Sequence, residues 1–324
     1  MSLLRVEQLA LRIGDTAALR EVSFSLQDGE CRALVGESGS GKSLTAMCLL
    51  GLAPANSLLT AGGLELAGQA LPPQGHGDWR HWRGRRIAMI FQNPMTALNP
   101  TQSVGSQLCE SFQLHRNMSR HQARRAAIAL LERLSIARAE QRMGQYPFEF
   151  SGGMLQRVMI ALAVACRPQL LIADEPTTAL DVTVQAEVLA LLRELQREQG
   201  TSLLFISHDL GVVANIADTV SVMYAGETVE SATRQALFSA AAHPYTEALR
   251  AAVPKLHSRE PMRAIPGSPP DLSRPLSGCA FAPRCTQRMA ICEEAPPTLL
   301  TPDGSAVRCW RWHAEHPLRW RWRR

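Results

Sequence analysis

A glycine-rich segment at residues 36–43 constrains this chain more than any other feature. It reads GESGSGKS, a complete G-x-x-x-x-G-K-[ST] pattern, between the apolar run Cys31–Val35 and an Ala-, Leu- and Met-rich stretch that ends at Leu52. The sequence therefore predicts a strand, a loop and a helix in that order. Glycines let backbone N–H groups curl around a polyphosphate, and the helix directs its positive end at the same anion. We expect a nucleotide phosphate site made of Gly36, Glu37, Ser38, Gly39, Ser40, Gly41, Lys42 and Ser43.

Two side chains carry the chemistry of this phosphate loop (residues 36–43). The Lys42 ammonium can reach the β- and γ-phosphates, and the Ser43 hydroxyl can ligate Mg²⁺. Only two lysines, Lys42 and Lys255, occur among the 34 basic residues. A glycine-rich loop that merely turns the chain is the alternative, and in a lysine-poor chain it rarely carries a lysine at this position.

Composition sets the class of protein. A length of 324 residues corresponds to about two domains, and 46% apolar with 19% charged residues is typical of a globular protein. The formal charge of +5 is too small to indicate a nucleic-acid partner without a localised basic stripe. No apolar run approaches the roughly 20 residues of a membrane helix, and the first residues lack a signal-peptide pattern, which favours a cytosolic chain.

Strands and helices alternate along most of the sequence. The segment Leu3–Leu26 alternates apolar and polar residues and predicts antiparallel strands. Helical spacing over residues 102–139 predicts a helical insert, with Ala126, Ala127, Leu130, Leu131 and Leu134 on one face. A buried strand at 170–173, a helix at 183–199 stopped by Gly200 and a second strand at 202–207 follow. This order predicts an α/β fold with a largely parallel sheet.

Two carboxylates end the apolar run at 170–173. Asp174 and Glu175 then lie at the carboxyl end of a buried strand, where open α/β sheets bind ligands. Asp174 is suited to the Mg²⁺ shell, and Glu175 can deprotonate the water that attacks the γ-phosphorus. A strand that simply reaches solvent is the alternative, and the phosphate loop makes it the weaker one.

A second anion site is predicted at residues 151–153. Ser151, Gly152 and Gly153 precede an Ala-rich helix, so they lie at a helix N-terminus. A plain helix cap is the alternative. Because the phosphate loop already supplies donors to its own nucleotide, this second site is better explained by a nucleotide held on another subunit.

Three further motifs accompany these: Gln92 in FQNP, Ala179-Leu180-Asp181 and Ser207-His208-Asp209. Together, the motifs resemble those of the ATPase subunits of ABC transporters over residues 3–250. The resemblance implies a P-loop ABC-type ATPase at residues 1–253, with a RecA-like core, an antiparallel β subdomain and a helical subdomain at about 93–160. It also implies a head-to-tail dimer that closes each ATP with the partner's Ser151–Gly153.

The resemblance also assigns roles to single residues. Gln92, Glu175 and His208 are the catalytic group, with Gln92 sensing the γ-phosphate and the metal and His208 contacting the γ-phosphate. Asp181 joins the nucleotide-binding set, and Ser43, Gln92 and Asp174 hold Mg²⁺. Ile13 stands where the family usually stacks an aromatic ring on adenine. On either side of the 151–153 motif, Phe150 stands where the family usually has Leu, and Met154 stands where it usually has Gln.

Three shorter stretches narrow the family. Residues 91–100, 243–246 and 265–267 resemble the importer subfamily for dipeptides, oligopeptides and nickel chelates. That resemblance implies a second, different ATPase subunit, two membrane permeases, an extracytoplasmic binding protein and a peripheral place on the cytoplasmic face of the inner membrane, with no nucleic-acid partner. The extension at 254–324 is closer to the peptide-type members.

Three other functions stay open. A nickel or metallophore importer differs only in the proteins that it docks. A soluble ABC ATPase acting on DNA or ribosomes usually carries two cassettes, and one is present here. A P-loop kinase leaves Ser151 and His208 unexplained.

Four cysteines cluster in the extension, with five, six and sixteen residues between them: Cys279, Cys285, Cys292 and Cys309. Clustered thiols in a reducing compartment favour a metal over disulfides, and four cysteines suit Zn²⁺ or a [4Fe–4S] cluster. The family resemblance favours iron–sulfur, and buried thiols without a ligand remain the alternative. The Trp/Arg-rich end, at 310–312 and 320–324, is interpreted as a solvated tail, with a membrane surface or stacked bases as alternatives.

Overall fold

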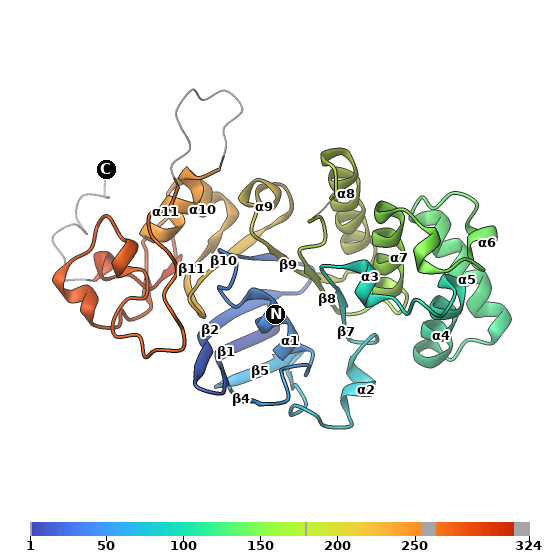
Figure 1. Cartoon of the computed structure of the whole chain (residues 1–324), viewed down its shortest axis with the longest axis horizontal. Helices are drawn as coiled ribbons and strands as arrows, with labels where there is room; N and C mark the ends of the chain where they lie inside the picture. Colours follow the sequence, from blue (N-terminus) through green and yellow to red (C-terminus); the bar gives the residue numbers. More distant parts are fainter. Residues whose placement is uncertain (1, 179, 254–263, 314–324) are drawn as a thin grey trace. The chain divides into compact units, whose positions relative to one another are not determined.

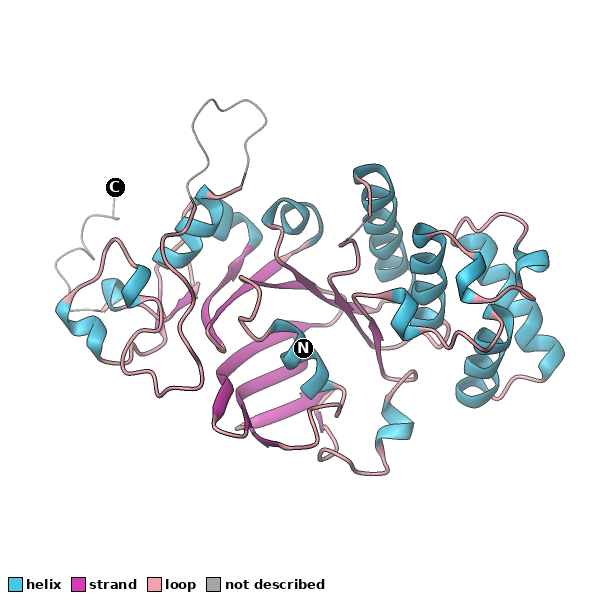
Figure 2. Cartoon of the chain, in the orientation of Figure 1, coloured by secondary structure: helices cyan, strands magenta, loops and turns pink. Residues whose placement is uncertain are grey.

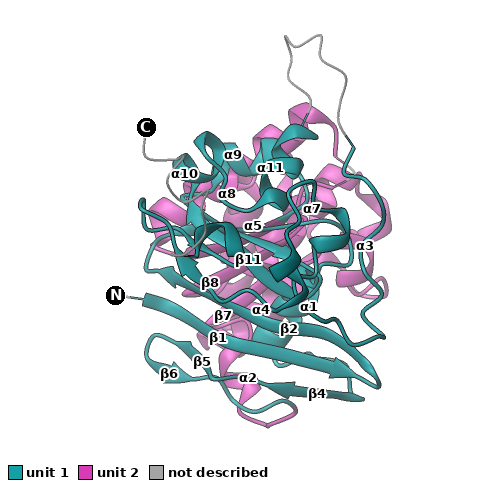
Figure 3. Cartoon of the chain, turned by 90° about the vertical axis from the view of Figure 1, so that its left-hand side faces the viewer, with its two compact units in different colours: residues 1–74, 207–324 teal, residues 75–206 magenta. Residues whose placement is uncertain are grey.

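The computed structural model describes residues 2–178, 180–253 and 264–313 of the chain. The chain divides into two compact units (Figure 3). The first unit comprises residues 1–74 and 207–324, and the second comprises residues 75–206.

The first unit begins with an antiparallel sheet (Figure 1). The N-terminal strands of the first unit are β1 (Ser2–Ile13), β2 (Thr16–Gln27), β3 (Cys31–Val35), β4 (Ser57–Thr60), β5 (Gly63–Leu66) and β6 (Gln69–Ala70). All of them except β3 belong to the antiparallel sheet. Strand β1 pairs antiparallel with β2, β4 and β5. On β2, Val22 and Leu26 are fully buried and Ser23 is exposed. The alternation in the sequence therefore predicted this sheet correctly.

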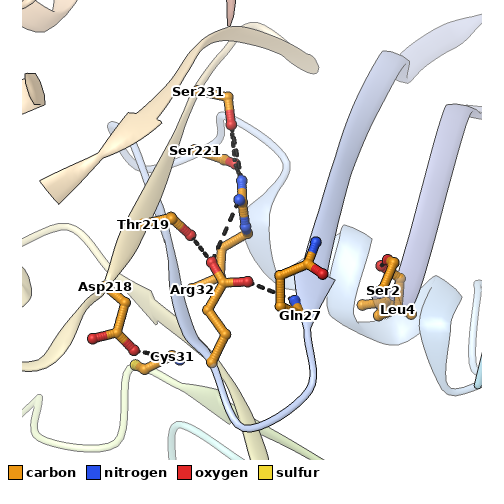
Figure 4. A network of polar contacts seen from close by, with 10 residues as sticks. Ser2, Leu4, Gln27, Cys31, Arg32, Asp218, Thr219, Ser221 and Ser231 are labelled. Atoms are coloured by element: carbon orange, nitrogen blue, oxygen red, sulfur yellow. Dashed lines mark hydrogen bonds and ion pairs between the residues drawn. The ribbon is translucent and has the colours of Figure 1, made fainter. Parts of the chain in front are cut away.

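Strand β3 belongs to the part of the first unit that carries the phosphate loop. It pairs parallel with β10 (Thr219–Tyr224), which pairs antiparallel with β11 (Glu227–Thr233). The guanidinium of Arg32 crosses these strands and donates to the hydroxyls of Ser221 and Ser231 at 3.0 and 2.9 Å (Figure 4). At the start of β3, Cys31 N–H donates to the Asp218 carboxylate at 2.8 Å. These bonds fix the strand from which the phosphate loop leaves.

The remaining elements of the first unit are short. They are α1 (Lys42–Leu49), α9 (Leu210–Ile216), α10 (Arg234–Ser239), α11 (Pro244–Ala251), the 3₁₀ turns η2 (Ala282–Arg284), η3 (Ala290–Glu293) and η4 (Trp310–Trp312), and strands β12 (Leu299–Leu300) and β13 (Ala306–Val307). Strand β13 pairs antiparallel with both β12 and β11. The described part of the extension therefore continues the sheet of the first unit.

The second unit combines a parallel sheet with helices (Figure 2). Its strands are β7 (Ile87–Ile90), β8 (Leu170–Asp174) and β9 (Ser202–Ser207), whose last residue, Ser207, belongs to the first unit. They pair in parallel in the order β7-β8-β9. Its helices are α2 (Trp79–Trp82), α3 (Pro94–Ala97), α4 (Val104–Arg116), α5 (Arg120–Arg133), α6 (Ala139–Arg142), η1 (Pro147–Glu149), α7 (Gly152–Val164) and α8 (Val182–Gln199).

Local sequence signals account for the helix boundaries here. Ser119 and Gln122 form a reciprocal capping box at the start of α5. Of the predicted apolar face, Ala127, Leu131 and Leu134 are fully buried, whereas Ala126 and Leu130 are half-buried. Gly200 ends α8 in the left-handed conformation at φ 64°. No helix of the described residues is long and apolar enough to cross a membrane.

Candidate active site

The phosphate loop connects β3 to α1 in the first unit. Gly36 has φ 156° and a Cβ at this position would lie 2.2 Å from the Met223 carbonyl oxygen, so no other residue fits. Lys42 is buried, and its Nζ donates to the carbonyl oxygens of Gly36 and Glu37 at 2.8 and 2.9 Å. The ammonium is therefore held across the loop, where it can exchange a carbonyl for a phosphate oxygen.

The polar groups of this loop fit an anion. The Ser40 hydroxyl is buried, and it has no hydrogen-bond partner among the described residues. Helix α1 begins at Lys42, and its N-cap residue, Gly41, has no side chain to occupy the first N–H groups. Ser43 is exposed in the first turn of α1. A buried orphan hydroxyl and an uncapped helix N-terminus are the features that a polyphosphate satisfies.

In the second unit, two predicted catalytic residues meet at the ends of adjacent strands. Gln92 follows β7 and Glu175 follows β8, and these parallel strands end at the same edge. The Gln92 amide donates to the Glu175 carboxylate at 2.9 Å, and Thr178 donates to the same oxygen at 3.0 Å. Asp174, the last residue of β8, is buried. The structure thus brings together Gln92 and Glu175, as their strand positions lead one to expect.

Glu175 adopts a backbone conformation that the sequence did not predict. Its φ is 46°, in the left-handed region that a non-glycine residue rarely occupies. Its N–H donates to the Ile206 carbonyl oxygen at 3.0 Å, which extends the pairing of β8 with β9. A left-handed residue held by such a bond is typical of a functional turn, because the surroundings must offset about 1–3 kcal/mol of strain.

Residues 151–153 form the start of α7 as predicted. Ser151 is the N-cap, but its side chain accepts no capping hydrogen bond, and both Ser151 and Gly152 are exposed. By contrast, the Asp181 carboxylate accepts from Val184 N–H at 2.9 Å and caps α8. Asp181 therefore caps a helix in this chain, whereas the N-terminus of α7 has no side-chain cap.

His208, which the resemblance predicts to contact the γ-phosphate, follows β9 and belongs to the first unit with the phosphate loop. His208 is exposed, and the next residue, Asp209, caps α9 by accepting from Gly211 N–H at 2.7 Å. The Ala179 of the predicted 179–181 motif lies outside the described residues.

Sequence reasoning missed two side chains that hold the phosphate loop from outside. Arg284 of the extension pairs with the Glu37 carboxylate through two hydrogen bonds of 2.6 and 3.0 Å, and these bonds raise the pKa of the guanidinium. The Tyr245 hydroxyl accepts from Glu37 N–H at 2.8 Å. The only sequence signal was indirect, because Tyr245 lies in one of the stretches that resemble the importer subfamily.

The four extension cysteines line one cavity in the first unit. Cys279, Cys285, Cys292 and Cys309 share it with Phe281 and Arg311, among other residues. None of the four is in a disulfide. Burial raises the pKa of Cys309 to about 12, and burial also raises the pKa of Cys279 and Cys285. Within the described ranges, no three His, Cys, Asp or Glu side chains are grouped closely enough to hold a single metal ion.

The interpretation of residues 310–312 as a solvated tail is wrong. Arg311 is buried and pairs with Glu247 at 3.3 Å. The Trp312 indole N–H donates to the Ala242 carbonyl oxygen at 3.0 Å. These residues form η4 and are packed within the first unit, because the indole of Trp312 and the guanidinium of Arg311 bond to residues far away in the sequence. Residues 320–324 lie outside the described part of the chain.

Known proteins match this chain along most of its length. A family model described as "ABC transporter" matches residues 19–178, and a second, "Oligopeptide/dipeptide transporter, C-terminal region", matches residues 229–292. The oligopeptide transport ATP-binding protein OppD of Bacillus subtilis is 47% identical over 97% of this chain and 90% of its own length. OppD of Escherichia coli is 48% identical over 92% of this chain and 88% of its own. The dipeptide transport ATP-binding protein DppD of Bacillus subtilis is 47% identical over 92% and 90%.

Solved structures agree in fold. The cbiO1 subunit of Clostridium perfringens, part of an ABC transporter complex, matches with a TM-score of 0.63 and 26% identity over 74% of this chain and 91% of its own. An ATP-binding cassette dimer in a post-hydrolysis state with ADP and phosphate matches with the same TM-score of 0.63, at 24% identity over 71% and 98%. The predicted α/β P-loop ABC ATPase fold is confirmed. The chain belongs to the ATP-binding subunits of ABC transporters, in the oligopeptide and dipeptide branch of that family.

Proposed function

We propose that this chain is the ATP-hydrolysing subunit of an importer for dipeptides or oligopeptides. The observation that carries the catalytic part is the contact of Gln92 and Thr178 with one oxygen of Glu175, at 2.9 and 3.0 Å. Such contacts orient a carboxylate toward a fixed point at the strand ends, as a general base requires. The substrate class is proposed from the relatives, which are named as oligopeptide and dipeptide transport ATP-binding proteins.

The residues divide the work of hydrolysis. Lys42 and the N–H groups of the phosphate loop bind the β- and γ-phosphates. Glu175 takes a proton from a water whose oxygen forms a bond to the γ-phosphorus, while the bond from that phosphorus to the bridging oxygen breaks and ADP leaves. Gln92 orients Glu175, and His208 contacts the γ-phosphate. Mg²⁺, which ABC ATPases use with ATP, would be held by oxygen donors of Ser43, Asp174 and Gln92 and would neutralise phosphate charge.

The Ser151–Gly153 motif is proposed to close the ATP of a partner subunit. Support comes from α7, whose N-cap side chain leaves the first N–H groups unused. An ATP bound there would accept those hydrogen bonds and join the two subunits head to tail. The proposed assembly contains a second, different ATPase subunit, two permeases and an extracytoplasmic binding protein, with this chain on the cytoplasmic face of the inner membrane.

We propose that the chain consists of an ATPase domain at 1–253 and an extension at 254–324. The four cysteines of that extension are proposed to hold a [4Fe–4S] cluster. Support comes from the cavity that the four cysteines line together. Anaerobically purified protein without iron and sulfide would overturn the cluster.

The proposed function is tested with the assembled complex and two substitutions. Glu175→Gln keeps the size of the side chain and the hydrogen bond from Thr178 but removes the base. We expect ATP binding to persist and ATP turnover to be lost. Glu140→Gln makes the same change at an exposed glutamate, whose side chain is 74% accessible, and serves as the control. Undiminished turnover with Glu175→Gln would refute the catalytic role of Glu175.

A further inference from the structure

The extension reaches the phosphate loop through a charged side chain. Arg284, at the end of η2, is only 5% exposed, and its two terminal nitrogens donate to the two carboxylate oxygens of Glu37 at 2.6 and 3.0 Å. Its third nitrogen donates to the Pro266 carbonyl oxygen at 2.8 Å, and a terminal nitrogen also reaches the Tyr224 hydroxyl at 3.2 Å. The guanidinium is therefore fixed in position and faces the loop with its planar fork.

Aromatic rings hold this contact in place. The ring of Phe281, three residues before Arg284, lies 5.3 Å from the rings of both Tyr224 and Tyr245, which are 4.6 Å from each other. The Tyr245 hydroxyl accepts from Glu37 N–H. The same loop residue is thus held at its carboxylate by the extension and at its backbone by α11.

A second part of the extension contacts the same loop. Pro269, Pro270 and Leu272 line a small cavity together with residues 37–40 of the loop. The Leu272 carbonyl oxygen also accepts from Ala17 N–H at 3.3 Å. The extension therefore covers the side of the phosphate loop next to Glu37.

The charge of Glu37 makes this contact relevant to the nucleotide. A phosphate loop receives a polyanion, and Glu37 is the second residue of that loop. A carboxylate there that lacks a counter-charge repels the incoming phosphates, and the repulsion is strong near a low-dielectric surface. The paired guanidinium cancels that charge.

We propose that Arg284 is a positioning residue for ATP: it neutralises Glu37 and so keeps the phosphate loop receptive to the nucleotide. The extension thereby sets the ATP affinity of this subunit. The inference rests on the proposal that residues 36–43 bind the phosphates of ATP.

The test is the dissociation constant of ATP, measured by calorimetry on the full-length chain. Arg284→Gln leaves Glu37 without its counter-charge, and we expect ATP to bind about tenfold more weakly. Arg284→Lys keeps the positive charge but loses the planar fork, so it should bind ATP more tightly than Arg284→Gln and more weakly than the wild-type chain. The decisive variant is Glu37→Gln combined with Arg284→Gln, which removes both charges and should restore most of the affinity.

Two controls separate this inference from other effects. Arg288→Gln removes an exposed arginine of the extension, paired with Glu293 at 3.4 Å, and should leave the affinity unchanged. Lys42→Ala should abolish binding, and if it does not, the assignment of the loop itself is wrong. The loss in Arg284→Gln should also shrink as salt is raised, because ions screen the repulsion.

The outcomes are distinct. An Arg284→Gln chain with wild-type ATP affinity overturns the inference. So does a double variant that binds as weakly as Arg284→Gln, since Arg284 would then act only as a structural brace. If Arg284→Gln does not fold, as judged by its melting curve, the comparison of Arg284→Lys and the double variant with the wild-type chain decides the question: weak binding by both overturns the inference.

Discussion

Replacing Gly36 by alanine is the sharpest test of the phosphate-loop geometry. The new Cβ would lie 2.2 Å from the carbonyl oxygen of Met223 and 2.8 Å from the Ser40 hydroxyl. The first obstacle is backbone at the end of β10, which cannot rotate away. The loop and the strand must separate instead.

The size of that movement follows from the distances. Real Cβ atoms essentially never approach within 3.0 Å of another heavy atom, so the contact must open by at least 3.0 − 2.2 = 0.8 Å. The Gly36 carbonyl oxygen lies 2.8 Å from the Lys42 Nζ, so the shift displaces the ammonium that binds phosphate. A misplacement of about 1 Å costs on the order of a hundredfold in turnover. We expect Gly36→Ala to lose ATP turnover by about that factor.

The matched control is Gly29→Ala, in the turn between β2 and β3. Gly29 also has a positive φ, 69°, but a Cβ there would meet nothing within 4 Å. It isolates backbone strain, about 1 kcal/mol of stability, from the clash. Steady-state ATP hydrolysis and ATP binding are measured for both variants in the assembled complex. If Gly36→Ala turns over ATP as fast as Gly29→Ala, the close approach of the loop to Met223 is not required for function.

Three further substitutions test the fold around the site. Glu230 is buried, and its carboxylate accepts from the N–H groups of Ala242 and His243, both at 2.8 Å. In denaturant unfolding, Glu230→Ala should lower the free energy of unfolding by about 3 kcal/mol, and Glu230→Gln should lower it by less. Asp181→Ala removes the cap of α8 and should cost about 1 kcal/mol; an unchanged unfolding midpoint would contradict the capping role. At Gly278, with φ 72°, a Cβ would lie 2.4 Å from the Cys292 carbonyl oxygen. Gly278→Ala should therefore distort the cysteine cavity and lower the iron content of anaerobically purified protein, whereas unaltered iron would argue against that cavity as the cluster site.

Local signals predicted the elements that carry the nucleotide chemistry. Strands β3 and β9 have the predicted bounds, because a short apolar run with a turn signal at its end has few alternatives. Gln92 was assigned to the catalytic group only by the resemblance, because strand β7, which brings it beside Glu175, was not predicted from the sequence. The left-handed φ of Glu175 was not predictable, since no residue preference favours it.

Contacts between distant parts of the sequence were out of reach. Glu37 and Arg284 are 247 residues apart, and no periodicity connects them. The same limit explains the error at residues 310–312. The sequence around Trp312 predicts a solvated side chain, and only the structure shows that its indole N–H donates to the Ala242 carbonyl oxygen. Sequence patterns report which face of an element is apolar, but not which distant polar group satisfies a particular donor.

The central claim is that ATP hydrolysis at Glu175 drives peptide import. The most direct measurement is uptake of a labelled dipeptide by cells whose only copy of this chain is wild type or Glu175→Gln, with labelled nickel followed in parallel. We expect Glu175→Gln to abolish peptide uptake and to leave nickel entry unchanged. Unchanged peptide uptake with a loss of nickel entry would contradict the peptide assignment, and unchanged uptake of both would contradict the claim that this chain powers import of either substrate.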